Sequence, residues 1–301
     1  MTKTSRKGLF LAFRYALLLV WTLISIFPVF WMISTSLKPY HEWFAWPAHF
    51  VPEEPTLNNY RIIWNPSSQP EGFGREQLQT SQVGSPLSSF MNTVIISFTS
   101  TVLSVAIGFL LAFGVSRYRV MPERRLLNLL ILRMVPPIAT ALPILIYYRW
   151  WEQTIGLKFL DTYHGLVILY VVTTLPYSVW MLKSFIDEVP IEIEQAAALL
   201  GASRLRTMGE VVFPLVRSGI VATLLFVLIL TWSEYLLALT LGFGDVSTLP
   251  IAMSRYEGLT EGRIYGHQAA LSVGVTIPLV IIGLVIHKHL VRGFSFGMMK
   301  R

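Results

Sequence analysis

Residues 90–115 of this chain read FMNTVIISFTSTVLSVAIGFLLAFGV and contain no charged side chain. A helix needs about 20 mostly apolar residues to cross the hydrocarbon core of a bilayer. The run is continuous, whereas a strand of a membrane barrel would alternate apolar and polar residues over a shorter length. This stretch therefore predicts a membrane-spanning helix.

The composition of the whole chain supports the same interpretation. The 301 residues are 53% hydrophobic and 14% charged, with a mean hydropathy of +0.57, whereas globular proteins carry roughly a quarter charged residues. A soluble protein this apolar could not cover its surface with polar groups. The chain has no cysteine, which excludes disulfides, thiolate metal sites and cysteine catalysis.

Six segments are apolar and long enough to span a bilayer, so we expect an all-α integral membrane protein with six transmembrane helices. They are approximately residues 10–36, 88–115, 126–149, 163–184, 215–243 and 266–287. A short N-terminal segment, residues 1–9, precedes a single transmembrane domain, residues 10–301. The first span is too long for the core of a signal peptide, and we expect it to be retained.

Basic residues predict the orientation. They gather at the N-terminus, after the second span and at the C-terminus, as Lys3, Arg6, Lys7, Arg117, Arg119, Arg124, Arg125, Lys288, Arg292, Lys300 and Arg301. Six spans place all three clusters on one side, and the positive-inside rule makes that side cytoplasmic, with both termini. Residues 37–87 are then external and residues 187–214 cytoplasmic. The basic residues flank apolar runs instead of forming one face, which indicates lipid headgroups as their partners and not nucleic acid.

Residues 187–214, DEVPIEIEQAAALLGASRLRTMGEVVFP, are expected to form two short helices that meet at a sharp corner. Pro190 suits a first helical turn, and the alanine- and leucine-rich residues 192–200 favour a helix. Gly201 fits a C-terminal cap with positive φ, and Ser203 can cap a second helix. Such a helix pair could seat in a groove of a partner protein. An ordinary loop packed on its own membrane domain is the alternative that these residues leave open.

This loop resembles the signature of the inner-membrane permeases of binding-protein-dependent ABC importers. That signature is Glu-Ala-Ala, three residues, glycine, nine residues, then Ile-x-Leu-Pro. The residues that carry or adjoin the match are Glu194, Gln195, Ala196, Ala197, Gly201, Ala202, Ser203 and Pro214. Gln195 stands where the family has glutamate. We therefore expect recognition of this loop to depend more on its shape than on a charged side chain. The resemblance implies that the loop docks on an ATPase subunit and transmits its closure.

Other stretches resemble the maltose-type sugar permeases in the same order along the chain. They are residues 36–39, 55–60, 92–93, 133–137, 161–166, 232–235 and 291–294. The resemblance implies the type I importer architecture, a bacterial or archaeal inner membrane, and a sugar or related polyol as cargo. The implied partners are a second homologous permease, an ATPase dimer and an external substrate-binding protein. The sequence lacks a Walker A motif, so ATP and Mg are expected on the ATPase, and this chain is expected to be no enzyme and to bind no cofactor or metal.

Ionisable groups inside a span are costly and suggest a function. Glu234 is the only acid inside a predicted span, and Arg133 is the only basic residue well inside one. The candidates for the translocation path are Asn92, Arg133, Pro136, Trp232 and Glu234. Pairing within the bundle is the structural alternative for Glu234. A self-sufficient secondary carrier or channel that uses Glu234 is the functional alternative, against which the lack of a visible inverted repeat weighs. A membrane enzyme ranks last, because no convergent set of catalytic residue types is evident.

Overall fold

A computed structural model describes residues 3–64, 86–132, 135–242, 244, 246–254, 257–258, 262–263 and 265–297. The chain was expected to form one transmembrane domain. Its contacts divide it into two compact units, one of Met1–Ser85 with Arg255–Thr276 and one of Pro86–Ser254 with Ile277–Arg301.

The first unit begins with the long helix α1 (Lys3–Ser36), whose apolar part is Phe10–Ser36. A short 3₁₀ turn, η1 (Tyr40–Glu42), and helix α2 (Asn58–Trp64) follow. The side-chain amide of Asn59 donates hydrogen bonds of 2.8 and 2.9 Å to the carbonyls of Ser36 and Lys38, which ties α2 to the end of α1. The unit also contains an antiparallel pair of two-residue strands, β1 (Glu257–Gly258) and β2 (Gly262–Arg263), and the start of α13 (Tyr265–Gly297).

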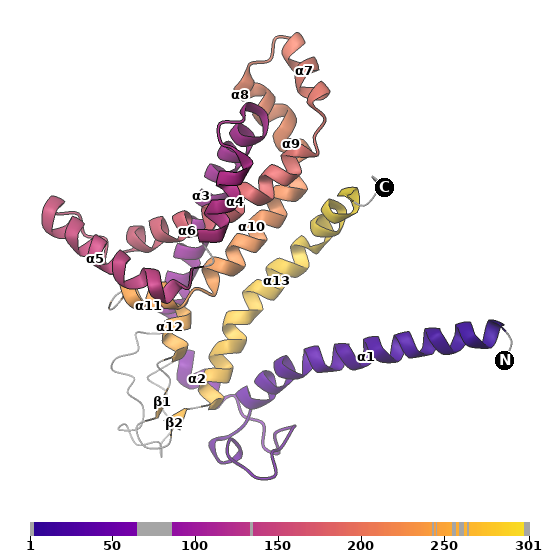
Figure 1. Ribbon diagram of the computed structural model, residues 1–301. Helices are drawn as coiled ribbons and strands as arrows, with labels where there is room; N and C mark the ends of the chain where they lie inside the picture. The colour runs from indigo at the N-terminus through magenta and orange to yellow at the C-terminus, as the bar shows by residue number, and fades with distance from the viewer. Residues whose placement is uncertain are drawn as a thin grey trace. The chain divides into compact units, whose positions relative to one another are not determined.

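Three helices form the centre of the second unit (Figure 1). Helix α3 (Pro86–Tyr118) packs along α6 (Tyr163–Asp187), and α10 (Arg217–Trp232) packs against both. Small hydroxyl residues line the contact: Ser104 Oγ lies 2.9 Å from Ser178 Oγ and accepts a 2.9 Å hydrogen bond from Thr174. Small side chains let membrane helices approach closely, and hydroxyl pairs satisfy each other where water is absent.

The remaining helices lie around this centre. They are α4 (Glu123–Leu132), α5 (Pro137–Ile155), α7 (Ile191–Leu199), α8 (Arg204–Arg206), the π-helical turn η3 (Thr207–Val212), α9 (Phe213–Leu215), α11 (Leu236–Leu241) and α12 (Leu249–Ser254). In Figure 1, α7 and α8 lie at one end of the second unit, and α11 and α12 lie toward its other end. Two apolar clusters fill the interior, one that includes Tyr170 and Leu241 and one that includes Leu182 and Val212.

Within the described residues, four helices are long and apolar enough to cross a membrane: Phe10–Ser36, Pro86–Tyr118, Tyr163–Asp187 and Tyr265–Val285. A fifth candidate is the pair Arg204–Leu215 and Arg217–Trp232, which is bent by 78°. Four of the six predicted spans thus correspond to single long helices and the fifth to this bent pair.

The third predicted span, residues 126–149, is divided into α4 and α5. Pro136 has an extended ψ of 133° and precedes α5, which begins at Pro137. A proline lacks the amide proton that would continue a preceding helix and disfavours helical geometry in the residue before it, so two in succession separate the helices. The count of six spanning helices is not confirmed by the described residues.

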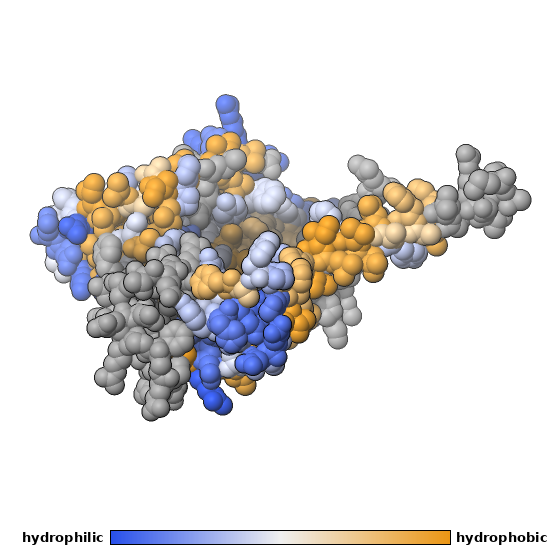
Figure 2. All heavy atoms as spheres, turned by 90° about the horizontal axis from the view of Figure 1, so that it is seen from below, coloured by the Kyte–Doolittle hydropathy of each residue, from blue (hydrophilic) through white to orange (hydrophobic). Residues whose placement is uncertain are grey.

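Large apolar side chains are exposed along the long helices. Phe10, Trp21 and Leu110 are examples, with 69%, 70% and 54% of their surface exposed. Figure 2 shows hydrophobic residues over wide areas of the face seen from below, interrupted by hydrophilic patches. Lipid and partner proteins can cover such surfaces, whereas water solvates them poorly.

Candidate functional site: the corner between α7 and α8

The first helix of the corner ends in a Schellman motif. Gly201 has φ +84°, and its amide donates to the carbonyl of Ala198 at 3.0 Å, while the amide of Ala202 donates to the carbonyl of Ala197 at 3.0 Å. This pair of bonds is the typical closure of a helix by a left-handed residue. A left-handed backbone at Gly201 was predicted from the sequence, and the structure has it.

The second helix starts where the sequence predicts but is less regular than expected. The Ser203 side chain accepts a hydrogen bond from the amide of Arg206 and caps α8. The chain then widens into the π turn η3, in which the amide of Phe213 bonds to the carbonyl of Met208, five residues back. Pro214 lies at the start of α9 and has no amide proton to donate. The corner is followed by the bend at Val216 that leads into α10.

The tip of the corner is apolar. Leu199 and Leu200 are each 90% exposed and Leu205 is 76% exposed. Gln195 is exposed as well, whereas its neighbour Glu194 is buried. Glu194 is therefore turned away from the surface, and the exposed residue directly before the Ala-Ala pair is the uncharged Gln195.

Glu194 is buried because it pairs with Arg117, which lies at the end of α3. Arg117 Nε donates to Glu194 Oε1 at 2.6 Å, and the two side chains are only 11% and 10% exposed. Arg117 Nη2 also donates to the carbonyls of Ile186 and Val189, at 2.8 and 2.9 Å. Removing one partner of a buried ion pair costs about 3 to 5 kcal/mol. From the sequence alone, Arg117 was predicted only as a marker of membrane orientation, because its partner lies 77 positions away.

A second polar contact joins the ends of α3 and α6. The Ser116 hydroxyl donates to Asp187 Oδ1, and Lys183 Nζ lies 2.6 Å from Asp187 Oδ2. In contrast, Arg206 and Glu210 form an exposed pair on the far part of the loop, at 2.9 Å, and this hydrogen bond raises the pKa of Arg206. Exposed pairs of this type contribute little to stability.

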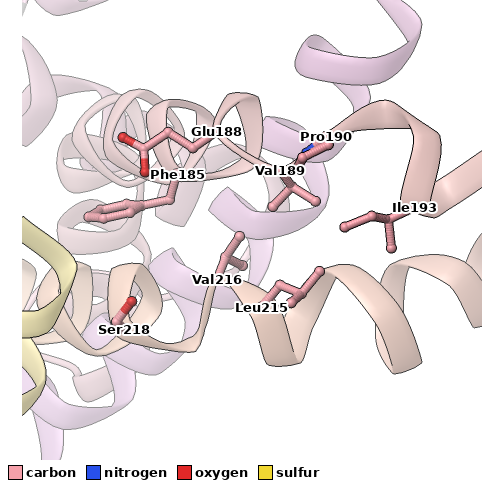
Figure 3. A pocket seen from close by; sticks show the side chains of 8 residues that line it. All are labelled: Phe185, Glu188, Val189, Pro190, Ile193, Leu215, Val216 and Ser218. Atoms are coloured by element: carbon pink, nitrogen blue, oxygen red, sulfur yellow. The ribbon is translucent and has the colours of Figure 1, made fainter. Parts of the chain in front are cut away.

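A pocket of about 250 Å³ lies beside the base of the corner (Figure 3). Its lining residues come from the end of α6, the start of α7 and the bend before α10: Phe185, Glu188, Val189, Pro190, Ile193, Leu215, Val216 and Ser218. In Figure 3, Val189 and Ile193 face Val216 and Leu215 across the space. The apolar contact between α7 and the α9–α10 bend is thus incomplete.

The candidates for the translocation path lie in different places. Asn92 is buried at the start of α3, where it donates to the carbonyl of Ser247 at 3.0 Å and accepts a 2.6 Å hydrogen bond from Tyr163. Pro136 is exposed between α4 and α5. Arg133 lies outside the described residues.

Trp232 and Glu234 lie at the break between α10 and α11. Glu234 Oε1 accepts a 3.0 Å hydrogen bond from the amide of Leu237, so the carboxylate caps the start of α11. Trp232 is 1% exposed and packs edge-on against Phe90, and its Nε1 is buried without a hydrogen-bond partner among the described residues. The structure thus gives Glu234 a partner within the second unit, which is the structural alternative that the sequence left open.

Asp161 holds the loop after α11. Its Oδ1 accepts hydrogen bonds of 3.1 Å from the amides of Gly244 and Val246, and its own amide donates to the carbonyl of Leu241. Asp161 has φ +53°, a conformation that aspartate tolerates better than most residues. Together with the Asn92 contact to Ser247, this network orders the first turns of α3 and α6 and the end of α11.

The sequence profile of the family "Binding-protein-dependent transport system inner membrane component" matches residues 104–296. The chain belongs to this family of multi-pass inner-membrane permeases. It is 30% identical to the trehalose transport system permease protein SugB of Mycobacterium tuberculosis, over 92% of this chain and 93% of that protein. It is 29% identical to the trehalose/maltose transport system permease protein MalG of Thermococcus litoralis, over 92% of each chain.

Solved structures show the same fold. A chain of a bacterial ABC transporter involved in the import of the acidic polysaccharide alginate superposes with a TM-score of 0.71, covering 96% of this chain and 98% of that chain at 18% identity. A chain of the MetNI methionine ABC transporter covers 69% of this chain with a TM-score of 0.52 at 16% identity. The fold expected from the sequence, a helical ABC permease, is confirmed.

Proposed function

We propose that this chain is one of two permease subunits of an ATP-driven importer of a sugar or related polyol, and that it forms half of the translocation path. The cargo class is supported by the names of several relatives, which transport trehalose, maltose, sulfoquinovosyl glycerol or diacetylchitobiose. An external substrate-binding protein delivers the cargo, and a second homologous permease completes the path. The membrane is the inner membrane of a bacterium or archaeon.

The observation that carries the proposal is the corner between α7 and α8. It presents Leu199, Leu200 and Leu205 to the outside, on a backbone fixed by Gly201 and Ser203. Apolar side chains on a short, ordered helix are suited to a groove of another protein. The corner lies in the cytoplasm and docks on an ATPase subunit, which binds ATP and Mg, because this sequence has no Walker A motif of its own.

The corner can be tested without changing its contacts. A Cβ atom on Gly201 would meet no atom within 4 Å, so a substitution there acts through the backbone and not through a clash. Gly201→Val forces a β-branched residue into the left-handed region, at a cost of about 1 to 3 kcal/mol. Gly201→Asn is the matched control, because asparagine adopts this region more readily.

We expect the Gly201→Val chain to insert in the membrane but to lose co-purification with the ATPase, or ATP-driven uptake, while Gly201→Asn retains most of both. Normal coupled uptake by Gly201→Val would contradict the assignment of the corner. The cargo is identified separately, by reconstituting the complex and measuring which sugar or polyol, with its binding protein, stimulates ATP hydrolysis.

A further inference from the structure

We propose that Arg117 is a positioning residue that fixes the direction of α7 relative to α3 and α6, so that movement of the corner reaches the membrane helices. The proposal rests on the proposed coupling function and assigns a role to a residue outside the corner itself. It concerns three elements that converge on one side chain: the end of α3, the end of α6 and the first turns of α7.

The guanidinium of Arg117 contacts both sides of the junction between α6 and α7. Its Nη2 donates to the carbonyl of Ile186 in the last turn of α6 and to that of Val189 in the link to α7, and its Nε donates to the carboxylate of Glu194 in α7. The carbonyls at a helix end carry partial negative charge, so a cation is favoured there. The planar guanidinium has several donors in a fixed geometry, which a lysine ammonium cannot reproduce.

Apolar packing holds α7 only in part on its other side, where α7 contacts η3. The pocket of about 250 Å³ separates the base of α7 from the α9–α10 bend. Two of its lining residues, Ile193 and Leu215, remain 41% and 52% exposed. Van der Waals contact is lost across an empty space. The buried ion pair is therefore the polar contact that holds α7 toward the end of α3.

The elements that Arg117 joins are themselves tightly connected. Ser116 donates to Asp187, and further along the same two helices Ser104 contacts Ser178. Helices α3 and α6 are thus linked at their ends as well as along their length. A displacement of α7 that pulls on Arg117 acts on both helices together.

The position of α7 can be measured directly in the full chain. Because the sequence has no cysteine, Leu199→Cys and Leu110→Cys allow two spin labels to be attached at exposed sites on α7 and α3. In lipid nanodiscs we expect one narrow distance distribution for the otherwise unchanged chain, a broader one for Arg117→Ala, and an intermediate one for Arg117→Lys. Arg206→Ala is the matched control, since it removes an exposed pair of the same loop, and it should leave the distribution unchanged. An unchanged distribution in Arg117→Ala would overturn the proposal.

The effect on transport coupling is measured as ATP hydrolysis by the assembled importer. We expect Arg117→Ala to retain assembly and unstimulated ATP hydrolysis, while stimulation by the cargo-loaded binding protein falls by about tenfold, within the usual range of coupling between sites. Glu194→Gln keeps an acceptor oxygen for Arg117, so its stimulation should fall less than that of Arg117→Ala. A broadened distance distribution with full stimulation would overturn the role in transmission. Failure of the proposed function is distinguishable, because the unaltered chain would then not assemble with an ATPase, whatever the distance measurement gives.

Discussion

Gly108 of α3 lies directly against Ser178 of α6 and has no side chain of its own to hold the two helices apart. A Cβ atom added to Gly108 would lie 2.6 Å from the Cβ of Ser178 and 3.3 Å from its carbonyl carbon. The adjacent Ser104 hydroxyl contacts the Ser178 hydroxyl at 2.9 Å. This tight contact between the two helices thus lies next to a hydrogen bond between them, and both depend on small residues.

Enlarging Gly108 should separate the helices. We expect Gly108→Ala to lower the free energy of unfolding by about 1 to 3 kcal/mol, the usual cost of overfilling a packed site. Ser178→Gly removes the Cβ that clashes, so the double variant Gly108→Ala with Ser178→Gly should be more stable than the sum of the single effects predicts. Thermal unfolding of the purified chain in detergent measures all three. Strict additivity would contradict the contact.

Asp161 should stabilise the loop after α11 through its carboxylate. Asp161→Ala removes the acceptor of two amide hydrogen bonds and places alanine at positive φ, for a loss of about 2 kcal/mol or more. Asp161→Asn keeps an acceptor oxygen and tolerates the backbone, so we expect a smaller loss. Amide hydrogen exchange at Gly244 and Val246 reports the effect, and equal protection in Asp161→Ala and the unaltered chain would argue against it.

Glu234 is expected to act as a helix cap and not as a proton relay. Glu234→Gln retains an oxygen that can accept from the amide of Leu237, so ATP-driven uptake should stay close to that of the unaltered importer. Glu234→Ala removes the cap and should cost about 1 kcal/mol of stability. Uptake by the reconstituted complex, measured beside thermal unfolding, separates the two roles. Loss of uptake in Glu234→Gln with unchanged stability would favour the carrier that uses this acid.

Lys38 should make the stability of the chain depend on pH. It is 3% exposed, and its Nζ lies 4.2 Å from the centroid of the Trp31 ring. Burial lowers the pKa of Lys38 below its ordinary value of 10.5, and the nearby charge of Glu42 opposes this in part. Between the two values the unfolded chain binds more protons than the folded one, so stability rises with pH in this window; below it the cost of burying the charged Lys38 is fully present and does not change with pH.

The comparison with Lys38→Met isolates this effect. As the pH is raised from about 7 toward 10, we expect the unfolding temperature of the unaltered chain to rise relative to that of Lys38→Met. The reason is that the cost of burying the charge disappears as Lys38 loses its proton. All other titrating groups are common to both chains and cancel in the difference. A difference that stays flat, or that moves the other way, would contradict the burial of a charged Lys38.

The parts of the fold set by local sequence could be predicted well. The span expected at residues 88–115 is the core of α3, and the one expected at 163–184 is α6 without its last turn. The positive φ at Gly201 and the cap at Ser203 also follow from the neighbouring residues alone. The division of the third span was harder to foresee, because residues 126–149 are apolar enough for one helix and only the prolines interrupt them.

Contacts between distant parts of the chain, at the corner and at the start of α3, could not be predicted. Arg117 and Glu194 are separated by 77 positions, and Asn92 and Ser247 by 155. Arg117 stands beside other basic residues that mark one side of the membrane. Its residue type and position therefore predicted the orientation of the chain and no specific contact. Hydropathy likewise gave no sign that Glu234 would meet the amide of Leu237.

The Schellman motif at the end of α7 has a thermodynamic consequence for assembly. It occupies the carbonyls of Ala197 and Ala198, so the tip of the corner offers a partner mainly the side chains of Leu199, Leu200 and Leu205. Burial of apolar surface gives association a negative heat-capacity change and weakens on cooling. The proposed complex of this chain with an ATPase should therefore loosen in the cold, and purification near 4 °C is the condition most prone to lose that partner.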